Sequence, residues 1–312
     1  MSSIQQKHNI QVLEYITGPE YSHINQLMDL CCSQENINLK LELDYKLHLS
    51  SLAANHSDRQ SGHKTEFLYF IEEELVSYLG ISCFDGVTGE LCGMTHPEYR
   101  AQGLFHRLLA LALNECRHSD YKRLLLLADG NSTSGMNFLL ANSSSYAHSE
   151  YRMKRLSSPV TGYETTEKKL DSTVTLRLAC KEDEMDIARL NAILFDEKEL
   201  GEETGEYKIT PLEEQPENYK TYMIELDGII IGKINVEYGD QYAFICGFGI
   251  LPEYRGKGYG RMGLTETLRL IEAQDVKIIE LDVVCTNKNA LGLYQSCGFE
   301  EQSVMNYYNM NT

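Results

Sequence analysis

Long apolar runs, a signal-like start and basic patches are all missing from this 312-residue sequence. No stretch approaches the ~20 apolar residues that a membrane-spanning helix needs, so we expect no membrane partner. The first residues are polar and lack a basic start followed by an apolar core, which predicts no secretory signal and a cytoplasmic location. The formal net charge is −18, and no basic patch is large enough to follow a phosphate backbone, so we expect no nucleic-acid partner.

Cysteine pairs and C-terminal histidines are missing as well. The nine cysteines contain no C-x-x-C motif and are odd in number, so the sequence predicts reduced thiols and no metal site. All nine histidines occur at or before position 148. Acid–base chemistry in the C-terminal half must therefore use other side chains.

The sequence does contain enough apolar material for about two globular domains, with 42% hydrophobic and 24% charged residues. The tetrapeptide Pro-Glu-Tyr-Arg occurs at 97–100 and again at 252–255, each time between an apolar run and a helical pattern. This repeat predicts two copies of one fold. We place the two domains at 1–156 and 172–312, with a linker at 157–171 that is rich in turn-forming and charged residues.

The second copy of the tetrapeptide continues into a glycine-rich turn. Gly256, Gly258 and Gly260 lie between an apolar run at 242–250 and a helical pattern at 261–272. Glycines allow the main chain to turn and to approach a ligand closely, and N–H groups at a helix start favour an anion. Cationic side chains lie at the same place: Arg255, Lys257 and Arg261. The stretch fits neither the dinucleotide fingerprint nor the Walker A loop, but it predicts a site for a phosphorylated cofactor.

The turn, Arg255-Gly-Lys-Gly258-Tyr-Gly260, resembles the acyl-CoA signature [RQ]-x-x-G-x-[GA] of the GCN5-related N-acetyltransferase (GNAT) superfamily. After another apolar run, residues 287–299 resemble the family's N-x-x-A-x-x-L-Y-x-x-x-G-F at every fixed position. The two motifs occur in the family's order, so the chain resembles a tandem-domain GNAT protein. The resemblance implies an α/β (α+β) fold with two GNAT-like domains, each a mixed, mostly antiparallel, splayed sheet flanked by helices.

The resemblance also implies acetyl-CoA (coenzyme A) as the cofactor. Backbone amides at 256–260 would hold the diphosphate, and the pantetheine arm would lie along the backbone at the end of the preceding strand. The N–H of Ile250 would stabilise negative charge on the thioester oxygen. The residues that the resemblance places at the cofactor are Phe248, Gly249, Ile250, Arg255, Gly256, Lys257, Gly258, Tyr259, Gly260, Arg261, Asn287 and Tyr294.

The catalytic residues follow from the same resemblance. Tyr294 matches the family position that faces the departing thiolate. Because a phenol has an ordinary pKa of ~10 and a thiol ~8.5, we expect Tyr294 to act mainly through a hydrogen bond that strengthens in the transition state. The acceptor amine must also lose a proton. Asp282 matches the offset of a proposed glutamate base in peptide-alanine N-acetyltransferases, and Glu237, alone or with Tyr238, is the alternative.

These features predict an acetyl-CoA-dependent N-acetyltransferase that moves an acetyl group directly to a primary amine in its C-terminal domain. The acceptor would be a small amine, an amino sugar or a peptide N-terminus. An acidic stretch at 182–217 favours a cationic acceptor, because a negative rim attracts positive charge. A non-catalytic acyl-CoA sensor or scaffold is the alternative, an amino-acid-thioester-dependent transferase is a third possibility, and either a monomer or a homodimer is compatible with the sequence.

The first copy of the repeat departs from the family pattern. Ala101 and Gln102 remove a glycine and a lysine from the turn, and Phe105 brings bulk to its last glycine position. Aligning the second motif places Ala141 where the second copy has Tyr294. We therefore predict a degenerate, non-catalytic N-terminal domain.

Overall fold

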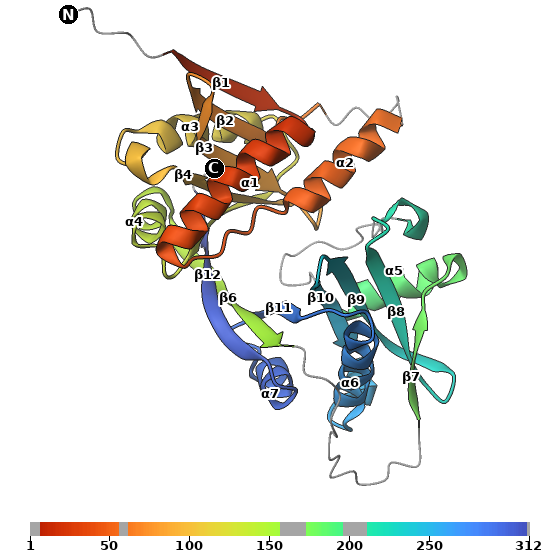
Figure 1. The fold of residues 1–312 in the computed structure, drawn as a ribbon. Helices are drawn as coiled ribbons and strands as arrows, with labels where there is room; N and C mark the ends of the chain where they lie inside the picture. The colour runs from red at the N-terminus through yellow and green to blue at the C-terminus, as the bar shows by residue number, and fades with distance from the viewer. Residues whose placement is uncertain (1–6, 56–61, 157–172, 196–210, 311–312) are drawn as a thin grey trace, which may run out of the picture. The chain divides into compact units, whose positions relative to one another are not determined.

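The computed structural model describes residues 7–55, 62–156, 173–195 and 211–310 (Figure 1). The chain forms two compact units. Unit 1 contains residues 1–151 and 303–312, and unit 2 contains residues 152–302. The expected linker at 157–171 lies outside the described residues, and so does the middle of the expected acidic stretch.

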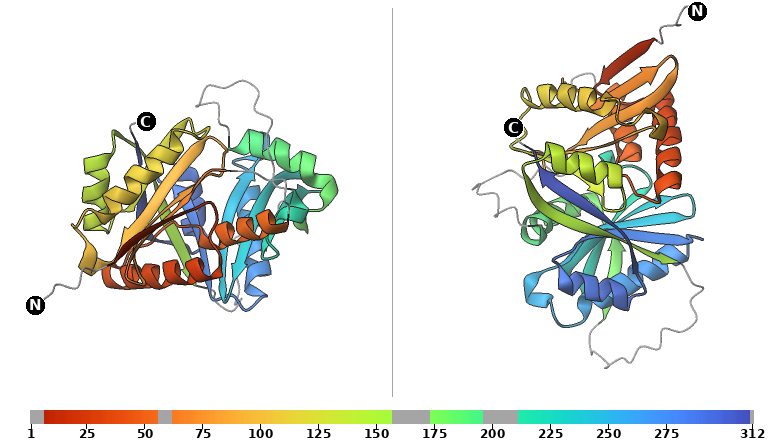
Figure 2. Two further views of the ribbon diagram at one scale, coloured as in Figure 1. Left: turned by 90° about the horizontal axis from the view of Figure 1, so that it is seen from above. Right: turned by 90° about the vertical axis from the view of Figure 1, so that its left-hand side faces the viewer.

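Unit 1 is a mixed sheet with helices on both faces (Figure 2). Its strands follow the order β1-β2-β3-β4-β5-β12-β6, in which β4 and β5 are parallel. Ile24 and Leu27 of α1 are buried against one face, and Leu108 of α3 and Leu139 of α4 against the other. The elements before β12 are β1 (His8–Leu13), α1 (Gly18–Glu35), α2 (Leu43–Asn55), β2 (Glu66–Ile71), β3 (Glu74–Ser82), β4 (Thr88–Thr95), the 3-10 turn η1 (Pro97–Tyr99), α3 (Leu104–Cys116), β5 (Arg123–Asp129), α4 (Thr133–Asn142) and β6 (Ser145–Leu156).

Unit 2 has the same architecture, with strands in the order β6-β11-β10-β9-β8-β7. Asp227 and Gly228, both at positive φ, form the hairpin turn between β8 and β9. Met223 of β8 faces α5, and its neighbour Ile224 faces Gly263 of α6. The elements are β7 (Val174–Leu178), the 3-10 turn η2 (Lys181–Asp183), α5 (Glu184–Leu194), the 3-10 turn η4 (Leu212–Glu214), β8 (Tyr219–Leu226), β9 (Ile229–Gly239), β10 (Tyr242–Ile250), the 3-10 turn η5 (Pro252–Tyr254), α6 (Tyr259–Glu272), β11 (Ile278–Val284), α7 (Lys288–Ser296) and β12 (Glu300–Asn309).

The two units repeat one another along the chain, as the sequence predicted. The offset is 155 residues for three pairs of elements: β5 and β11 (Arg123, Ile278), α4 and α7 (Thr133, Lys288), and β6 and β12 (Ser145, Glu300). The same offset pairs Tyr294 with Leu139, so the alignment of Tyr294 with Ala141 is wrong by two residues. Leu139 is fully buried and carries no hydroxyl, so unit 1 still has no counterpart of the tyrosine.

Two strands take part in both units, which differs from the expected boundaries. β6 begins in unit 1, but its last residues, 152–156, lie beside β11 of unit 2. β12 begins in unit 2, but its residues from 303 onward lie in unit 1, where Met305 to Asn309 pair with β5. Residues 152–156, which the sequence analysis assigned to the N-terminal domain, therefore belong to unit 2, and residues from 303 onward, assigned to the C-terminal domain, belong to unit 1.

Candidate active site

The parallel strands β10 and β11 separate at the centre of unit 2. Their pairing runs only from Tyr242 opposite Ile278 to Ile245 opposite Leu281. On its other edge β10 stays paired with β9, and the N–H of Leu251 donates to β9 at the Ile231 carbonyl, at 2.8 Å. Since successive N–H groups of a strand point to opposite edges, the N–H of the preceding residue points toward the separated edge. That residue is Ile250, the expected oxyanion donor.

A turn with an unusual backbone follows β10. Gly256 and Gly258 have φ of 73° and 89°, a region that favours glycine. Gly258 is also the N-cap of α6, and it has no side chain that could bond to the first N–H groups of the helix. These N–H groups have no partner within the helix itself, so the turn presents donors and the positive end of a helix dipole. A Cβ at either glycine would meet no atom within 4 Å.

The cationic residues of the turn have contacts of their own. Arg255 donates from Nε to the carbonyl of Ile250 at 2.7 Å, and Arg100 of unit 1 makes the same contact with Thr95 at 3.1 Å. This contact fixes the end of the strand in both units, a role that the sequence motif did not suggest. Two other expected cofactor residues belong to this turn: Lys257, whose ammonium donates to the Glu253 carbonyl at 2.9 Å, and Tyr259, whose ring lies 6.4 Å from that of Tyr254. Arg261 is exposed in the first turn of α6.

Tyr294 of α7 lies against apolar side chains. Its ring centre is 6.3 Å from that of Phe248 and 6.0 Å from that of Phe299. Burial, and to a smaller extent the nearby Cys297, raises the pKa of the Tyr294 phenol above its ordinary value. The phenol therefore stays protonated near neutral pH and is suited to donating a hydrogen bond.

The other expected cofactor residues surround the same region. Phe248 and Ile250 lie next to Gly260 of α6, where a Cβ would approach both side chains to within 4 Å. Gly249 faces the opposite side of the sheet, where a Cβ would collide with Leu194 of α5. Asn287 is the N-cap of α7, and its Oδ1 accepts the N–H of Ala290 at 3.1 Å.

Asp282, one of the two expected bases, forms an ion pair with Arg152 of β6. Arg152 donates from Nε to Oδ1 at 2.6 Å and from Nη2 to Oδ2 at 3.1 Å, and from Nη1 to Glu280 at 3.2 Å. Its guanidinium carbon also lies 4.9 Å from the ring centre of Phe244. Burial lowers the pKa of the Arg152 guanidinium, but the charge of Asp282 and the hydrogen bonds to it raise this pKa by more, so it lies above its usual value. Both oxygens of Asp282 thus accept charge-assisted hydrogen bonds.

The ion pair predicts a loss of stability when it is broken. We expect Asp282→Asn and Arg152→Met each to lower the free energy of unfolding by about 2 kcal/mol, less than for a fully buried pair because both side chains are partly exposed. The double variant should lose less than the sum, by ~1 kcal/mol or more. Urea denaturation measures all three variants. If Asp282→Asn kept its stability and lost all acetyl transfer, Asp282 would be a base and not a structural partner.

Glu237, the alternative base, lies on a polar face of β9. Residues 233, 235 and 237 share this face, because Lys233 is opposite Met223, which packs toward α5. Tyr238 points to the other face, and its hydroxyl lies 3.3 Å from that of Tyr222. Adjacent strand residues cannot share a face, so the combination of Glu237 with Tyr238 as one proton acceptor is wrong.

Two further residues of this face escaped the sequence analysis. Lys233 and Asn235 are only 2% and 8% exposed, and both approach the bulge in β10 between Cys246 and Gly249. Burial lowers the pKa of Lys233 to about 8. In the sequence they stand in an apolar strand, and only their alternation with isoleucine and valine could have indicated one polar face.

The lowered pKa of Lys233 predicts a pH dependence of stability. Unfolding returns Lys233 to its ordinary pKa, so the unfolded chain binds more protons between pH ~8 and ~10.5. Below pH 8 the buried ammonium is charged and lowers the unfolding free energy by the full amount. This loss of stability disappears as the pH rises through the range. We therefore expect the unfolding free energy of the wild type to rise relative to that of Lys233→Met between pH 7 and 10, by about 2.5 kcal/mol. Chemical denaturation at several pH values measures this difference, and a constant difference would contradict it.

Unit 1 keeps the backbone of the turn but not its side chains. Ala101 and Gly103, at φ of 59° and 76°, occupy the positions of Gly256 and Gly258. The strand leaves room for the ring of Phe105 because Gly93 has no Cβ; a Cβ there would lie only 2.9 Å from the ring. The ring also packs edge-on against Phe138.

The aromatic and the glycine have therefore exchanged places between the units. Unit 2 has Phe248 on the strand and Gly260 on the helix, whereas unit 1 has Gly93 on the strand and Phe105 on the helix. The expectation that Phe105 places its bulk in the turn itself does not agree with this packing.

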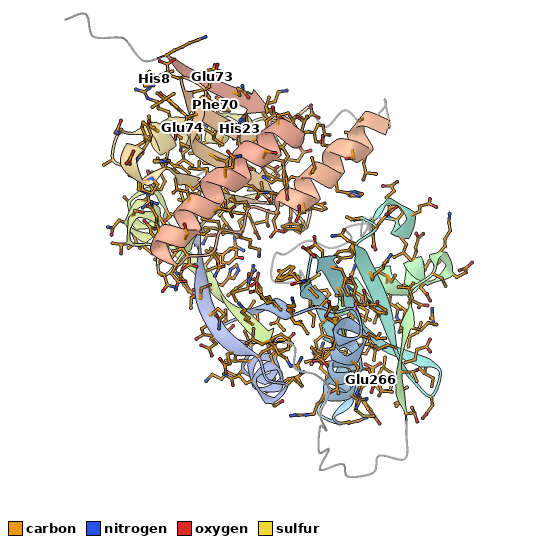
Figure 3. The ribbon with its side chains drawn as sticks, viewed as in Figure 1. His8, His23, Phe70, Glu73, Glu74 and Glu266 are labelled. Carbon is orange, nitrogen blue, oxygen red and sulfur yellow. The ribbon has the colours of Figure 1, made fainter. Side chains whose placement is uncertain are left out.

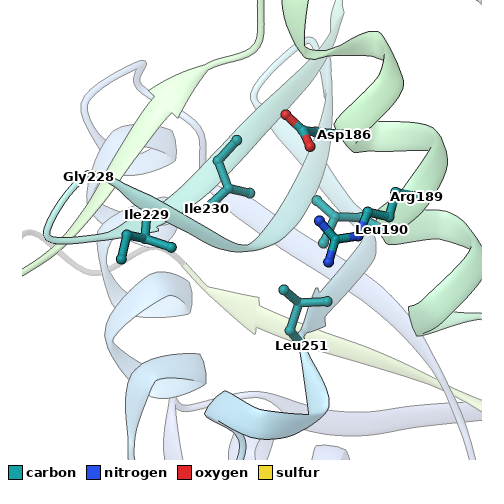
Figure 4. A pocket seen from close by; sticks show the side chains of 7 residues that line it. All are labelled: Asp186, Arg189, Leu190, Gly228, Ile229, Ile230 and Leu251. Atoms are coloured by element: carbon teal, nitrogen blue, oxygen red, sulfur yellow. The ribbon is translucent and has the colours of Figure 1, made fainter.

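Other features of the molecule lie away from this region. The described histidines belong to unit 1, where His8 packs edge-on against Tyr69 and His23 against Phe70. Figure 3 labels both of these histidines and Phe70. A shallow cleft of 270 Å³ in unit 2 contains none of the expected site residues (Figure 4). Its lining consists of Asp186, Arg189, Leu190, Gly228, Ile229, Ile230 and Leu251.

Two kinds of feature are absent from the described residues. In the ranges 7–55, 62–156, 173–195 and 211–310, no three His, Cys, Asp or Glu side chains are arranged to bind a metal ion. None of the helices within those ranges has the length and hydrophobicity that a bilayer crossing requires.

Part of the chain matches a known protein family. Residues 187–299 match the family model described as Acetyltransferase (GNAT) family. The uncharacterized N-acetyltransferase YycN of Bacillus subtilis is 35% identical over 69 residues, which are 22% of this chain and 44% of that protein. The mycothiol acetyltransferase of Streptomyces coelicolor is 26% identical over 243 residues, covering 72% of this chain and 73% of that protein. The match to YycN thus spans less than half of that relative.

A solved structure shares the fold of both units. The GCN5-related N-acetyltransferase from Sphaerobacter thermophilus aligns with a TM-score of 0.68 and 14% identity, covering 98% of this chain and 96% of that one. The similarity extends across unit 1 as well as unit 2.

Proposed function

The chain belongs to the GNAT superfamily, and on this premise we propose that it is an acetyl-CoA-dependent N-acetyltransferase acting through unit 2. The observation that carries the proposal is the juxtaposition in one unit of three features: the glycine turn at 256–260, the separated strands beyond Ile245, and the buried phenol of Tyr294. Together they offer a site for a diphosphate, an edge for a pantetheine arm, and a donor near the thiolate.

The cofactor would be held mainly by backbone groups. N–H groups of the turn and of the first residues of α6 would bind the diphosphate of coenzyme A. Exposed Lys257 and Arg261 would add positive charge. The backbone from Phe248 to Ile250 would pair with the amides of the pantetheine arm as an added strand does. When bound, acetyl-CoA supplies the acetyl group as a thioester.

The transfer itself would need little more than positioning and electrostatics. The N–H of Ile250 would stabilise negative charge on the carbonyl oxygen as the amine attacks. Tyr294 would donate a hydrogen bond to the sulfur as the carbon–sulfur bond breaks. Glu237, which lies on the same face as Lys233 and Asn235, is our candidate for accepting the proton of the amine, directly or through water.

The acceptor side would be the face of the sheet toward α5. The side chains of Lys233, Asn235 and Glu237 lie on this face, whereas Phe248 lies next to α6. We propose a primary amine as the acceptor.

Purified protein tests the proposal in two steps. We expect calorimetry to detect acetyl-CoA binding and a thiol reagent to detect coenzyme A release when amines are added. Binding without release over a broad amine panel would favour the non-catalytic acyl-CoA sensor. Absence of binding would overturn the proposed function.

A further inference from the structure

The side chains of Lys233 and Asn235 of β9 both end next to Gly247, which lies in the bulge of β10. The Nζ of Lys233 donates to the carbonyl of Gly247 at 3.3 Å. A Cβ on Gly247 would lie 3.0 Å from this Nζ and 2.3 Å from Nδ2 of Asn235. The two side chains therefore end within a few ångströms of each other, and Gly247, at φ 53°, leaves them room.

Both buried side chains have unmet bonding capacity. Oδ1 of Asn235 has no hydrogen-bond partner among the described residues. An ammonium has three N–H donors. Among the described residues Lys233 donates to the Gly247 carbonyl, the ring of Phe195 is 5.3 Å away, and the Cys246 thiol is close enough to interact with its charge. A buried acceptor without a donor and a buried cation without an anion are both costly, so native structures normally satisfy them.

The pair lies next to the point where the acetyl group would be transferred. Gly247 directly precedes Phe248, whose ring is paired with that of Tyr294. The side chains of Lys233 and Asn235 are on the face toward α5, opposite the face of Phe248. The pair therefore lies on the side of the sheet from which the acceptor would approach in the proposed function.

We propose that Lys233 and Asn235 bind the acceptor, and that this acceptor is an α-amino acid with a free carboxylate. The carboxylate would bind the ammonium of Lys233, and the amine would donate to Oδ1 of Asn235, close to the acetyl group. An α-amino acid carries its donor and its anion only two bonds apart, which suits two side chains that end this close together. The inference rests on the proposed function and specifies its substrate class.

This inference narrows the expected cationic acceptor to one that also carries an anion. A second cationic group on the acceptor would be repelled by the buried ammonium of Lys233, which below pH 8 carries its charge. The acidic side chain of Glu237 on the same face would still attract the amine. The face is therefore suited to a zwitterion, with Lys233 at its positive end.

Three matched substrates test the inference on the wild-type protein loaded with acetyl-CoA: leucine, leucinamide and isopentylamine, with further sets that carry other side chains. Coenzyme A release gives kcat/KM for each. We expect the amino acid to exceed the amine that lacks the carboxylate by roughly tenfold to a hundredfold, the contribution of one charged hydrogen bond. Equal values for the acid and its amide would overturn the claim of a free carboxylate.

Variants separate the two side chains. Lys233→Met should abolish the preference for the acid, so that in this variant kcat/KM for leucine falls to about the value for isopentylamine. Asn235→Leu should lower kcat/KM for all three substrates by roughly tenfold. Lys220→Met is the matched control, because Lys220 adjoins Thr221, which lies opposite Asn235, and so points to the other face; it should keep the preference.

The outcomes distinguish this inference from the proposed function. Acetylation of all three substrates at similar rates, or an equal loss in Lys233→Met for all of them, would overturn the inference and leave the acetyltransferase intact. Release with none of the amines would overturn the function. In that case, calorimetry on the protein saturated with coenzyme A would still test the binding site. Tighter binding of leucine than of isopentylamine would support it, and equal or absent binding would reject it.

Discussion

Gly258→Val is expected to weaken coenzyme A binding by roughly a hundredfold or more. Gly258 has φ of 89° and begins α6, and a β-branched residue is strongly disfavoured in this region of the backbone. The strain costs about 1–2 kcal/mol, and a shifted turn also loses charge-assisted hydrogen bonds to the diphosphate, each about 1.5–3 kcal/mol. Isothermal titration with coenzyme A measures the change, with a thermal melt to confirm that the variant is folded.

Gly103→Val in unit 1 provides a matched control. Gly103 is likewise the N-cap of a helix, at φ of 76°, and a Cβ there would also meet no atom within 4 Å. The two substitutions therefore impose the same strain in equivalent turns. We expect Gly103→Val to keep the affinity of the wild type. If Gly258→Val also kept it, the glycine turn of unit 2 would not bind the diphosphate, and the proposed function would lose its basis.

Tyr294→Phe is expected to lower kcat by at least about tenfold with little change in the affinity for acetyl-CoA. The phenol would stabilise charge that exists only once the thiolate begins to leave, so its loss affects the transition state and not the bound cofactor. Because burial raises the pKa of Tyr294, proton delivery to sulfur is less favourable than for an ordinary phenol. Steady-state kinetics at saturating acetyl-CoA and cofactor titration together measure the two effects.

Tyr238→Phe is the control for losing a hydroxyl from unit 2. Its hydroxyl lies near that of Tyr222 on the other side of the sheet from the acceptor face. We expect its kcat to match that of the wild type, with at most a small loss of stability. An equal turnover of Tyr294→Phe and the wild type would remove Tyr294 from the catalytic residues.

The sequence predicted the elements of the candidate site better than their partners. The turn at 256–260, the strand before it and the helix after it agree with the structure, because each depends on local features: glycine at positive φ, an apolar run and a helical period. The ion pair between Asp282 and Arg152 was not predictable in this way. Its two residues are 130 positions apart, and Arg152 stood in what the sequence assigned to another domain.

What the sequence determined by itself was the repeated fold and the identity of its motifs. Strand, turn and helix preferences act over a few residues, so they can be read from one short segment at a time. The tertiary structure alone decided which strand completes each unit and which carboxylate forms an ion pair with Arg152. It also decided that the side chains of Lys233 and Asn235 both end next to Gly247. These outcomes depend on the pairing and packing of distant segments, which leave no pattern in the local sequence.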